Sequence, residues 1–266
     1  MNENFNVRGT VPLVHCITNY VTVNDVANAV LACGGSPIMA DDIGEAADIA
    51  RIANALVINI GTLNARTAES MLAAGKAANA AGVPVLLDPV GAGASALRND
   101  AVRRLTEEVR FAVIRGNLSE MSFIAGLNAN TRGVDSAAED GANDAAAVAA
   151  AVAEKYGAVA AVTGAADVIS DGKRIARIRN GVAAMGKVTG TGCMLSGVTG
   201  AYIGANADKF AAVVKAVASM GIAGELAYHK AEAYGTGSFH IAIIDALSRI
   251  DDAAIEKYGR IEYEEK

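Results

Sequence analysis

Short apolar runs rich in β-branched residues alternate with longer alanine-rich stretches from the N-terminus to Thr163. The short runs predict strands at residues 13–17, 37–39, 56–60, 83–88, 112–115 and 159–163. Several of them are apolar throughout, which is typical of parallel strands buried on both faces. The longer stretches predict helices at residues 22–33, 44–52, 65–81, 98–108 and 138–155. This alternation predicts an α/β fold with a mainly parallel central sheet and helices on both faces.

The pattern changes after Thr163. Residues 168–178 predict two strands around Asp171-Gly172, because an Asp-Gly pair between strand-like runs is a hairpin signal. From Cys193 onward the pattern is mostly helical, and the acidic tail, residues 262–266, predicts a frayed end. Only four prolines occur and the glycines gather at strand ends, so we find no linker and expect one domain over residues 1–266.

Composition supports a large core and disfavours two kinds of partner. Hydrophobic residues make up 52% of the 266 residues and charged residues 20%. The net charge is −6 without a basic run, so nucleic acid is not an expected partner. No uninterrupted apolar stretch reaches the ~20 residues that span a bilayer, and the N-terminus lacks a signal-peptide pattern. We therefore expect a cytoplasmic protein without a membrane partner.

The loop Gly190-Thr191-Gly192-Cys193 leads into a helical run. A helix that starts there presents unpaired backbone N–H groups and the positive end of its dipole, and these together favour an anion. A tight turn without a ligand explains the glycines equally well. At a helix start the thiolate form of Cys193 is favoured, so this residue could accept a proton or act as a nucleophile. Taken in isolation, Cys193 is better explained as a small buried hydrophobe.

Polar groups also follow three predicted strands. Asp88 ends an apolar strand before a Gly-rich loop, where a carboxylate can hold Mg²⁺ through water or simply cap the next segment. Thr163 closes another strand and offers a hydroxyl group. Since ligands collect at the carboxyl ends of parallel strands, the clustering of such groups favours a phosphate site.

A third strand end carries Arg115, Asn117, Ser119 and Glu120 within six residues. Arginine can brace phosphates, and Glu120 could share a metal ion with Asp88. Alternatively, Asn117 or Ser119 is a helix N-cap and Glu120 lies in the first helical turn. Near the N-terminus, Met39 suits a pocket for a small apolar ring, although its spacing alone favours ordinary core filler.

Five segments together resemble the hydroxyethylthiazole kinase family of thiamine salvage, within the ribokinase-like superfamily. CITNYVT, SPIMA, LLDPVGAGAS, IRGNLSE and VTGTGCMLS fall in the family's order and spacing, and the resemblance extends over nearly the whole chain. It implies a ribokinase-like three-layer sandwich. It also implies ATP-dependent phosphorylation, with Mg²⁺, of the primary hydroxyl of 4-methyl-5-(2-hydroxyethyl)thiazole by a homotrimer with active sites between subunits.

The resemblance also assigns roles to individual residues. It gives the thiazole contacts to Met39, Gly190 and Asn19, the ATP contacts to Arg115 and Thr163, and the metal to Asp88 and Glu120. Cys193 stands where many ribokinase-like sugar kinases carry a catalytic Asp, so we expect it to act as the base. The backbone N–H groups of Gly190, Thr191, Gly192 and Cys193 would hold charge that develops on the transferred phosphoryl group.

Two departures and two rivals stand beside this interpretation. Residues 180–187 lack the His and paired leucines expected of the family, and residues 135–144 form an acidic, inserted segment that we expect to be exposed. A sister enzyme such as a hydroxymethylpyrimidine kinase would share the fold and ATP site, but CITNYVT and SPIMA disfavour it. A non-catalytic binder of a thiazole or nucleotide is disfavoured by the retention of Asp88, Arg115 and Glu120.

Overall fold

The computed structural model describes residues 7–127 and 138–265, and these form a nine-stranded sheet. The spatial order is β2-β1-β3-β4-β5-β6-β7-β8-β9, in which β1 to β6 are parallel and β7 to β9 antiparallel. The strands are β1 Leu13–Ile17, β2 Ser36–Ile38, β3 Ala55–Asn59, β4 Val85–Asp88, β5 Val113–Asn117, β6 Val159–Thr163, β7 Asp167–Ser170, β8 Arg174–Ile178 and β9 Ile261–Glu265.

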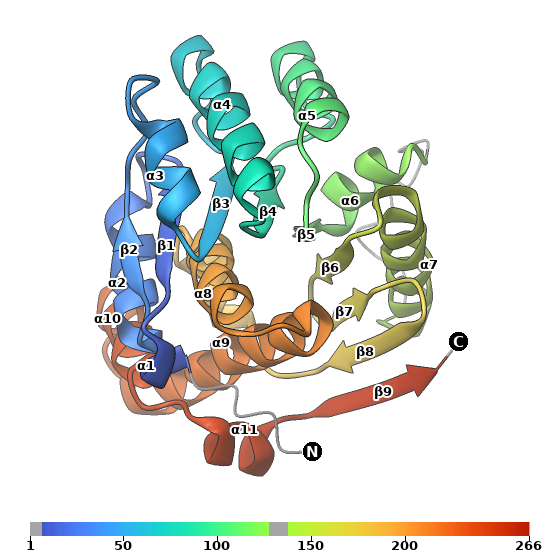
Figure 1. The fold of residues 1–266 in the computed structure, drawn as a ribbon. Coiled ribbons are helices and arrows are strands. Elements are labelled where there is room, and N and C mark those ends of the chain that lie inside the picture. The colour runs from blue at the N-terminus through green and yellow to red at the C-terminus, as the bar shows by residue number, and fades with distance from the viewer. Residues whose placement is uncertain (1–6, 128–137, 266) are drawn as a thin grey trace.

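Helices cover both faces of the sheet (Figure 1). One face carries α3 Ala46–Ile52, α4 Ala65–Ala81, α5 Ala96–Glu108, α6 Leu118–Ala125 and α7 Ala138–Tyr156. The other carries α2 Val23–Cys33, α8 Thr191–Ala205 and α9 Lys209–Ala231, together with α1 Val7–Thr10, α10 Thr236–Leu247 and α11 Asp252–Tyr258. A short 3₁₀ helix, η1 Ala183–Lys187, precedes α8. The predicted α/β sandwich, with a mainly parallel sheet between two helical layers, is confirmed.

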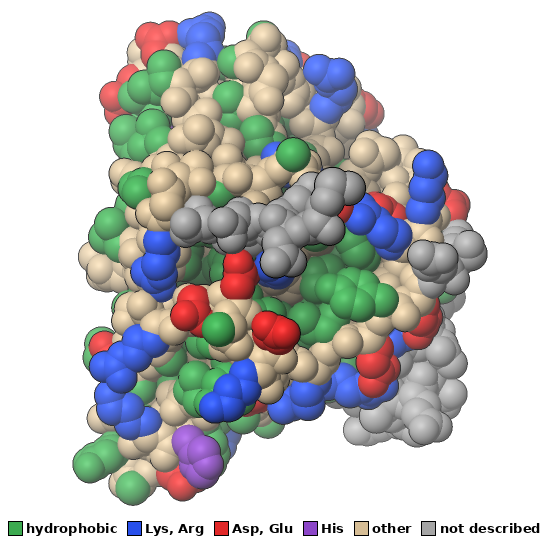
Figure 2. Space-filling view, turned by 60° about the horizontal axis from the view of Figure 1, so that its bottom comes forward, with side chains coloured by type: hydrophobic (Ala, Val, Ile, Leu, Met, Phe, Trp, Pro, Cys, Tyr) green, Lys and Arg blue, Asp and Glu red, His purple; other side chains and the backbone are tan. Residues whose placement is uncertain are grey.

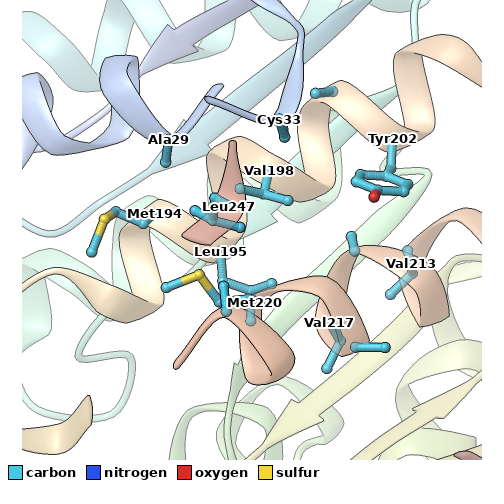
Figure 3. Packing of buried hydrophobic residues seen from close by; sticks show 14 of the residues in the cluster. Ala29, Cys33, Met194, Leu195, Val198, Tyr202, Val213, Val217, Met220 and Leu247 are labelled. Atoms are coloured by element: carbon cyan, nitrogen blue, oxygen red, sulfur yellow. The ribbon is translucent and has the colours of Figure 1, made fainter. Parts of the chain in front are cut away.

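Strand β3 shows why the apolar runs have no polar positions. Its side chains alternate between two cores: Val57 joins the cluster under α8 and α9, while Leu56 and Ile58 join the cluster under α4. Because both faces are covered, every position is buried. On the α8 side, residues of α2, α8, α9 and α10 interdigitate, among them Val198, Tyr202 and Val217 (Figure 3).

Helix α9 is the most apolar long helix in the described part of the chain. Its length and composition would suit a membrane span, but 78% of its most apolar window is buried inside the fold. Packing against β6, β7 and β8 therefore accounts for its apolar character. On the face shown in Figure 2, Lys and Arg side chains are interspersed with Asp and Glu.

Most predicted elements are confirmed within two residues at each end, and the Asp171-Gly172 hairpin is the turn between β7 and β8. The predicted frayed tail is wrong. Strand β9 pairs antiparallel with β8 from Ile178↔Ile261 to Arg174↔Glu265. The acidic strand is retained because its partner is basic: Arg177 lies 2.9 Å from Glu264. Of the acidic segment 135–144, residues 135–137 lie outside the described residues and Ala138 begins α7.

Candidate active site

The carboxyl ends of three parallel strands bring Asp88, Arg115 and Thr163 together. Asp88 ends β4, Arg115 lies in β5 and Thr163 ends β6. Arg115 links the other two, since its Nη1 is 3.2 Å from Asp88 Oδ2 and its Nη2 donates to Thr163 Oγ1 at 2.9 Å. The sequence-predicted strand-end groups therefore form one continuous hydrogen-bonded network.

Asp88 is 1% exposed and lies at the centre of this network. Its Oδ2 accepts hydrogen bonds from Asn59 Nδ2 at 2.7 Å, from Ser196 Oγ at 2.7 Å and from Arg115. Burial raises the pKa of Asp88, and the nearby charge of Glu120 adds to that effect. The Arg115 charge and the Ser196 and Asn59 hydrogen bonds lower the pKa without offsetting burial.

Helix α8 crosses the sheet closely enough to hold its first turn over these residues. A Cβ at Gly200 would lie 2.6 Å from Val57 Cγ2, so only glycine permits this approach to β3. Gly190 is the N-cap, with φ 87°, and Met194 N donates the first helical hydrogen bond to Gly190 O at 2.8 Å. No side chain caps this end. The N–H groups of Thr191, Gly192 and Cys193 thus have no carbonyl partner within the helix.

Replacing Gly190 by alanine is expected to destabilise the fold and impair the site. The left-handed φ and a Cβ 2.5 Å from Thr22 Cγ2 would force the turn to move, at about 1–3 kcal/mol in free energy of unfolding. Chemical denaturation and kcat measure the two effects. Gly237→Ala is the control, because a Cβ at Gly237 meets nothing within 4 Å and the residue lies in α10, outside both cavities. Equal stability and activity of the two variants would refute this reading of Gly190.

Two side-chain amides hold the sulfur atom of Cys193. Its Sγ accepts hydrogen bonds from Asn19 Nδ2 at 3.1 Å and from Asn59 Nδ2 at 3.3 Å. Asn19 Nδ2 also reaches Asn59 Oδ1, and Asn19 Oδ1 accepts from the N–H and hydroxyl of Thr22. Cys193 is only half-buried, against the apolar cluster of α8 and α9. It is thus neither a fully buried hydrophobe nor an unbonded thiol.

Two cavities lie beside these residues. The larger, of about 480 Å³, is lined by Arg115, Thr163 and Gly192 on one side and by residues 180–186 and α9 on the other. The smaller, of about 280 Å³, is lined by Met39 and Asn59 together with Cys16, Thr18, Tyr20, Val23, Asp41, Thr62, Asn64, Arg66, Thr67 and Met71. Asn59 lines the smaller cavity and Gly192 the larger one. Cys193 follows Gly192 in the chain and accepts a hydrogen bond from Asn59, so it connects the walls of the two cavities.

Met39 fulfils both sequence interpretations, because it packs against the core and lines the smaller cavity. The segment that carries it is held by His15, whose Nε2 lies 2.7 Å from Ala40 O. Burial lowers the pKa of His15, so the ring is neutral and donates this bond. Asn19 is not among the residues that line this cavity, but it donates a hydrogen bond to Asn59, which is.

Glu120 fulfils the capping alternative and still faces the site. Asn117, not Ser119, is the N-cap of α6, and Glu120 Oε2 accepts from Asn117 N at 2.9 Å in a capping box. Glu120 Oε1 accepts from Gly91 N at 2.8 Å, which ties α6 to the loop after Asp88. One carboxylate thus caps a helix and fixes the Gly-rich loop.

The two carboxylates fit Mg²⁺ better than a metal held by protein alone. In residues 7–127 and 138–265, no three His, Cys, Asp or Glu side chains gather around a common point. Asp88 and Glu120 interact electrostatically, as the pKa of Asp88 shows. Mg²⁺ keeps several waters and needs only one or two carboxylates besides substrate phosphates. The donor set therefore suits a metal ion that arrives with a nucleotide.

Sequence reasoning missed Asn59, Ser196 and Asp167. Asn59 ends an apolar strand as Asp88 does, and that shared position was the available signal. Ser196 lies one helical turn beyond Gly192, on the side of α8 that faces Arg115. Asp167 lines the larger cavity and accepts from Gly164 N at 2.9 Å. Burial raises the pKa of Asp167 to about 6, with the Gly164 bond and the Arg115 charge opposing it.

Replacing Asp167 by asparagine is expected to stabilise the fold at pH 7.5 by about 1–2 kcal/mol. The folded carboxyl group has the higher pKa, so its ionisation costs stability as pH rises from the ordinary value of 3.8 to about 6. Asparagine removes that cost and keeps an acceptor for Gly164. Thermal melts at pH 4 and pH 7.5 check the sign. A variant that is no more stable than wild type at pH 7.5 would contradict it.

The fold and the paired cavities define a ribokinase-like kinase. A structure of pyridoxal kinase from Staphylococcus aureus in complex with AMP-PCP and pyridoxal superposes with a TM-score of 0.65 at 14% identity, covering 96% of this chain and 100% of that one, and so shares the fold. The structure of the hydroxyethylthiazole kinase protein from Pyrococcus horikoshii OT3 matches with a TM-score of 0.88 at 39% identity, covering 97% and 96%.

Sequence comparison gives the family. The model of the hydroxyethylthiazole kinase family matches residues 5–253. A hydroxyethylthiazole kinase of Ruminiclostridium cellulolyticum is 58% identical, over 96% of this chain and 94% of the relative, and one of Clostridium beijerinckii is 55% identical over the same shares. The chain therefore belongs to the hydroxyethylthiazole kinase family, and the resemblance of its five motifs is confirmed.

Proposed function

We propose that this chain transfers the γ-phosphoryl group of ATP to the primary hydroxyl of 4-methyl-5-(2-hydroxyethyl)thiazole, as a single kinase domain over residues 1–266. The products are the thiazole phosphate and ADP, and the hydroxyl proton is released. One observation carries the proposal: Cys193 joins the wall of a large cavity, through Gly192, to the wall of a small one, through Asn59. Family membership supports the thiazole alcohol as acceptor.

The larger cavity is the proposed ATP site. Arg115 lines this cavity and brings a permanent cation to it, which suits the phosphate oxygens of a nucleotide. Thr163 adds a hydroxyl group beside it. The N–H groups at the start of α8 would hold the negative charge of the group in transfer. Asp88 and Glu120 would hold Mg²⁺, which supplies charge neutralisation on the phosphates when it is bound.

The smaller cavity is the proposed acceptor site. Met39, Met71 and Cys16 give it a polarisable wall suited to a sulfur-containing ring. The hydroxyethyl arm would extend toward Asn59, which places its hydroxyl oxygen beside Cys193 Sγ. As that oxygen bonds to the phosphorus atom, Sγ accepts the hydroxyl proton. The amides of Asn19 and Asn59 orient the sulfur for this step.

The acceptor preference is tested by ADP release with a panel of alcohols. We expect the thiazole alcohol to give the highest kcat/KM, well above hydroxymethylpyrimidine and pyridoxal. If hydroxymethylpyrimidine is the better acceptor, the chain has the sister activity. If no alcohol stimulates ADP release while nucleotide and thiazole bind, the chain is a binding protein.

We also propose a cytoplasmic homotrimer with active sites between subunits, as the family resemblance implies. Exposed apolar side chains beside the acceptor cavity support a covering neighbour: Tyr20 is 76% exposed and Val21 57%. Light scattering should give the mass of three chains of 27.0 kDa each. A monomeric mass with full activity would exclude a shared site.

A further inference from the structure

Residues 180–186 form the wall of the larger cavity that faces Arg115, and a polar cluster that runs from the buried Asn180 out to the surface at Arg260 supports this wall. Asn180 and Gly181 both line the cavity, and Asn180 is 6% exposed. The cluster consists of Asn180, Glu225 of α9 and Arg260, which lies just before β9. These three residues are far apart in the sequence.

Asn180 uses both ends of its amide to bind the C-terminal segment. Its Nδ2 donates to Tyr258 O at 2.9 Å, and its Oδ1 accepts from Arg260 N at 2.7 Å. Arg179 N also donates to Arg260 O at 3.0 Å. The backbone just before β9, at Tyr258 and Arg260, thus holds residues 179–180.

Glu225 connects the same segment to α9. Its Oε1 accepts from Gly181 N at 2.6 Å and from Arg260 Nη2 at 2.6 Å, and its carboxylate lies 3.3–3.4 Å from Asn180 Nδ2. The Arg260 guanidinium group also donates to the carbonyl of Arg179. A charge-assisted network of this kind fixes backbone position because each member has several partners.

Glycines on α9 allow the wall to lie directly against the helix. A Cβ at Gly221 would be 2.7 Å from Asn180 Cβ, and one at Gly224 would overlap Met185 Sδ. Met185 lines the cavity as well. The wall therefore has no space to retreat toward α9, and the cluster with Glu225 and Arg260 holds its N-terminal end in place.

We infer that the segment just before β9, residues 258–260, supports the nucleotide site from outside the cavity, with Asn180, Glu225 and Arg260 as positioning residues that set the width of the ATP cavity. The inference rests on the proposed function, since it takes the larger cavity as the ATP site. It gives a role to the contacts that precede β9 and to residues 180–186, which line the cavity.

The test is nucleotide affinity, measured by calorimetry with AMP-PCP in the absence of acceptor. Arg260→Met is expected to weaken binding about tenfold, because the loss of a charge-assisted bond shifts the wall. KM for the thiazole alcohol should stay within about twofold, since its cavity is remote from the cluster. Arg179→Met is the matched control: it removes an exposed ion pair with Glu262 on the same strand pair and should leave both values unchanged.

Glu225→Gln serves as a second variant should Arg260→Met fold poorly. It keeps one acceptor oxygen for Gly181 but loses the charge and the second acceptor, so an intermediate loss of affinity is expected, less than additive with Arg260→Met. Equal AMP-PCP affinity for wild type and both variants would overturn the inference, as would an equal loss for nucleotide and thiazole. A wild-type chain that binds no nucleotide would overturn the proposed function along with it.

Discussion

Replacing Arg115 by methionine is expected to lower kcat/KM by about 10³-fold or more, because one guanidinium group serves the whole phosphate side of the site. Its Nη1 contacts Asp88 and Gly192 O, its Nη2 contacts Thr163, and the residue lines the larger cavity. The same change leaves Asp88 buried without a counter-charge, which should cost about 3–5 kcal/mol of unfolding free energy. Steady-state kinetics and denaturant melts measure both effects.

The two consequences can be separated by a second substitution. In the double variant Arg115→Met, Asp88→Asn the uncompensated charge is gone, so stability should recover, while activity stays lost because both a phosphate contact and a proposed metal ligand are missing. Arg104→Met is the control for removing an arginine, since that side chain forms an exposed pair with Glu69. Recovery of activity together with stability would mean that Arg115 acts only through the fold.

Replacing Cys193 by alanine is expected to lower kcat by about 10²-fold and to leave ATP affinity intact. The sulfur atom is the acceptor of two amide hydrogen bonds between the two cavities, so its loss removes the proposed base without removing a phosphate contact. We place the effect at the lower end of the range for general bases, because phosphoryl transfer depends mainly on positioning and charge neutralisation. Rapid-quench kinetics and nucleotide titration separate the two quantities.

The companion variant Cys193→Asp supplies the carboxylate that ribokinase-like sugar kinases carry at this place. We expect it to remain active, because Asn19 and Asn59 can donate to an oxygen as they do to sulfur. Equal kcat for wild type and Cys193→Ala would remove the base role. Complete inactivity of Cys193→Asp in a folded chain would show that the site requires the larger sulfur atom.

Much of the fold could be read from local pattern because its sheet is buried on both sides. The apolar runs that become β3 and β4 are continuous, and their carboxyl ends must meet at one edge, so Asp88 and Arg115 were predictable as neighbours. Strand β9 was not predictable in this way. Its alternating acidic residues look solvated, and only the basic strand β8, more than eighty residues earlier, makes pairing favourable.

The details of the site depend on contacts that no local pattern contains. Asn59 meets Asp88 because β3 and β4 are neighbours in the sheet, and Ser196 meets Asp88 because glycines let α8 cross β3 closely. Sequence motifs identified Cys193 as the base candidate. The structure adds what the motifs could not: the two amides that bind its sulfur and its place between two cavities.

The central claim is that the two cavities hold ATP and a thiazole alcohol whose hydroxyl is phosphorylated at Cys193. The most direct measurement is product analysis of wild-type chain incubated with Mg²⁺, ATP and 4-methyl-5-(2-hydroxyethyl)thiazole. We predict ADP and the thiazole monophosphate in equal amounts, with ADP near background when the thiazole is omitted. ADP formed without phosphorylated thiazole, or no turnover despite binding of both ligands, would contradict the account.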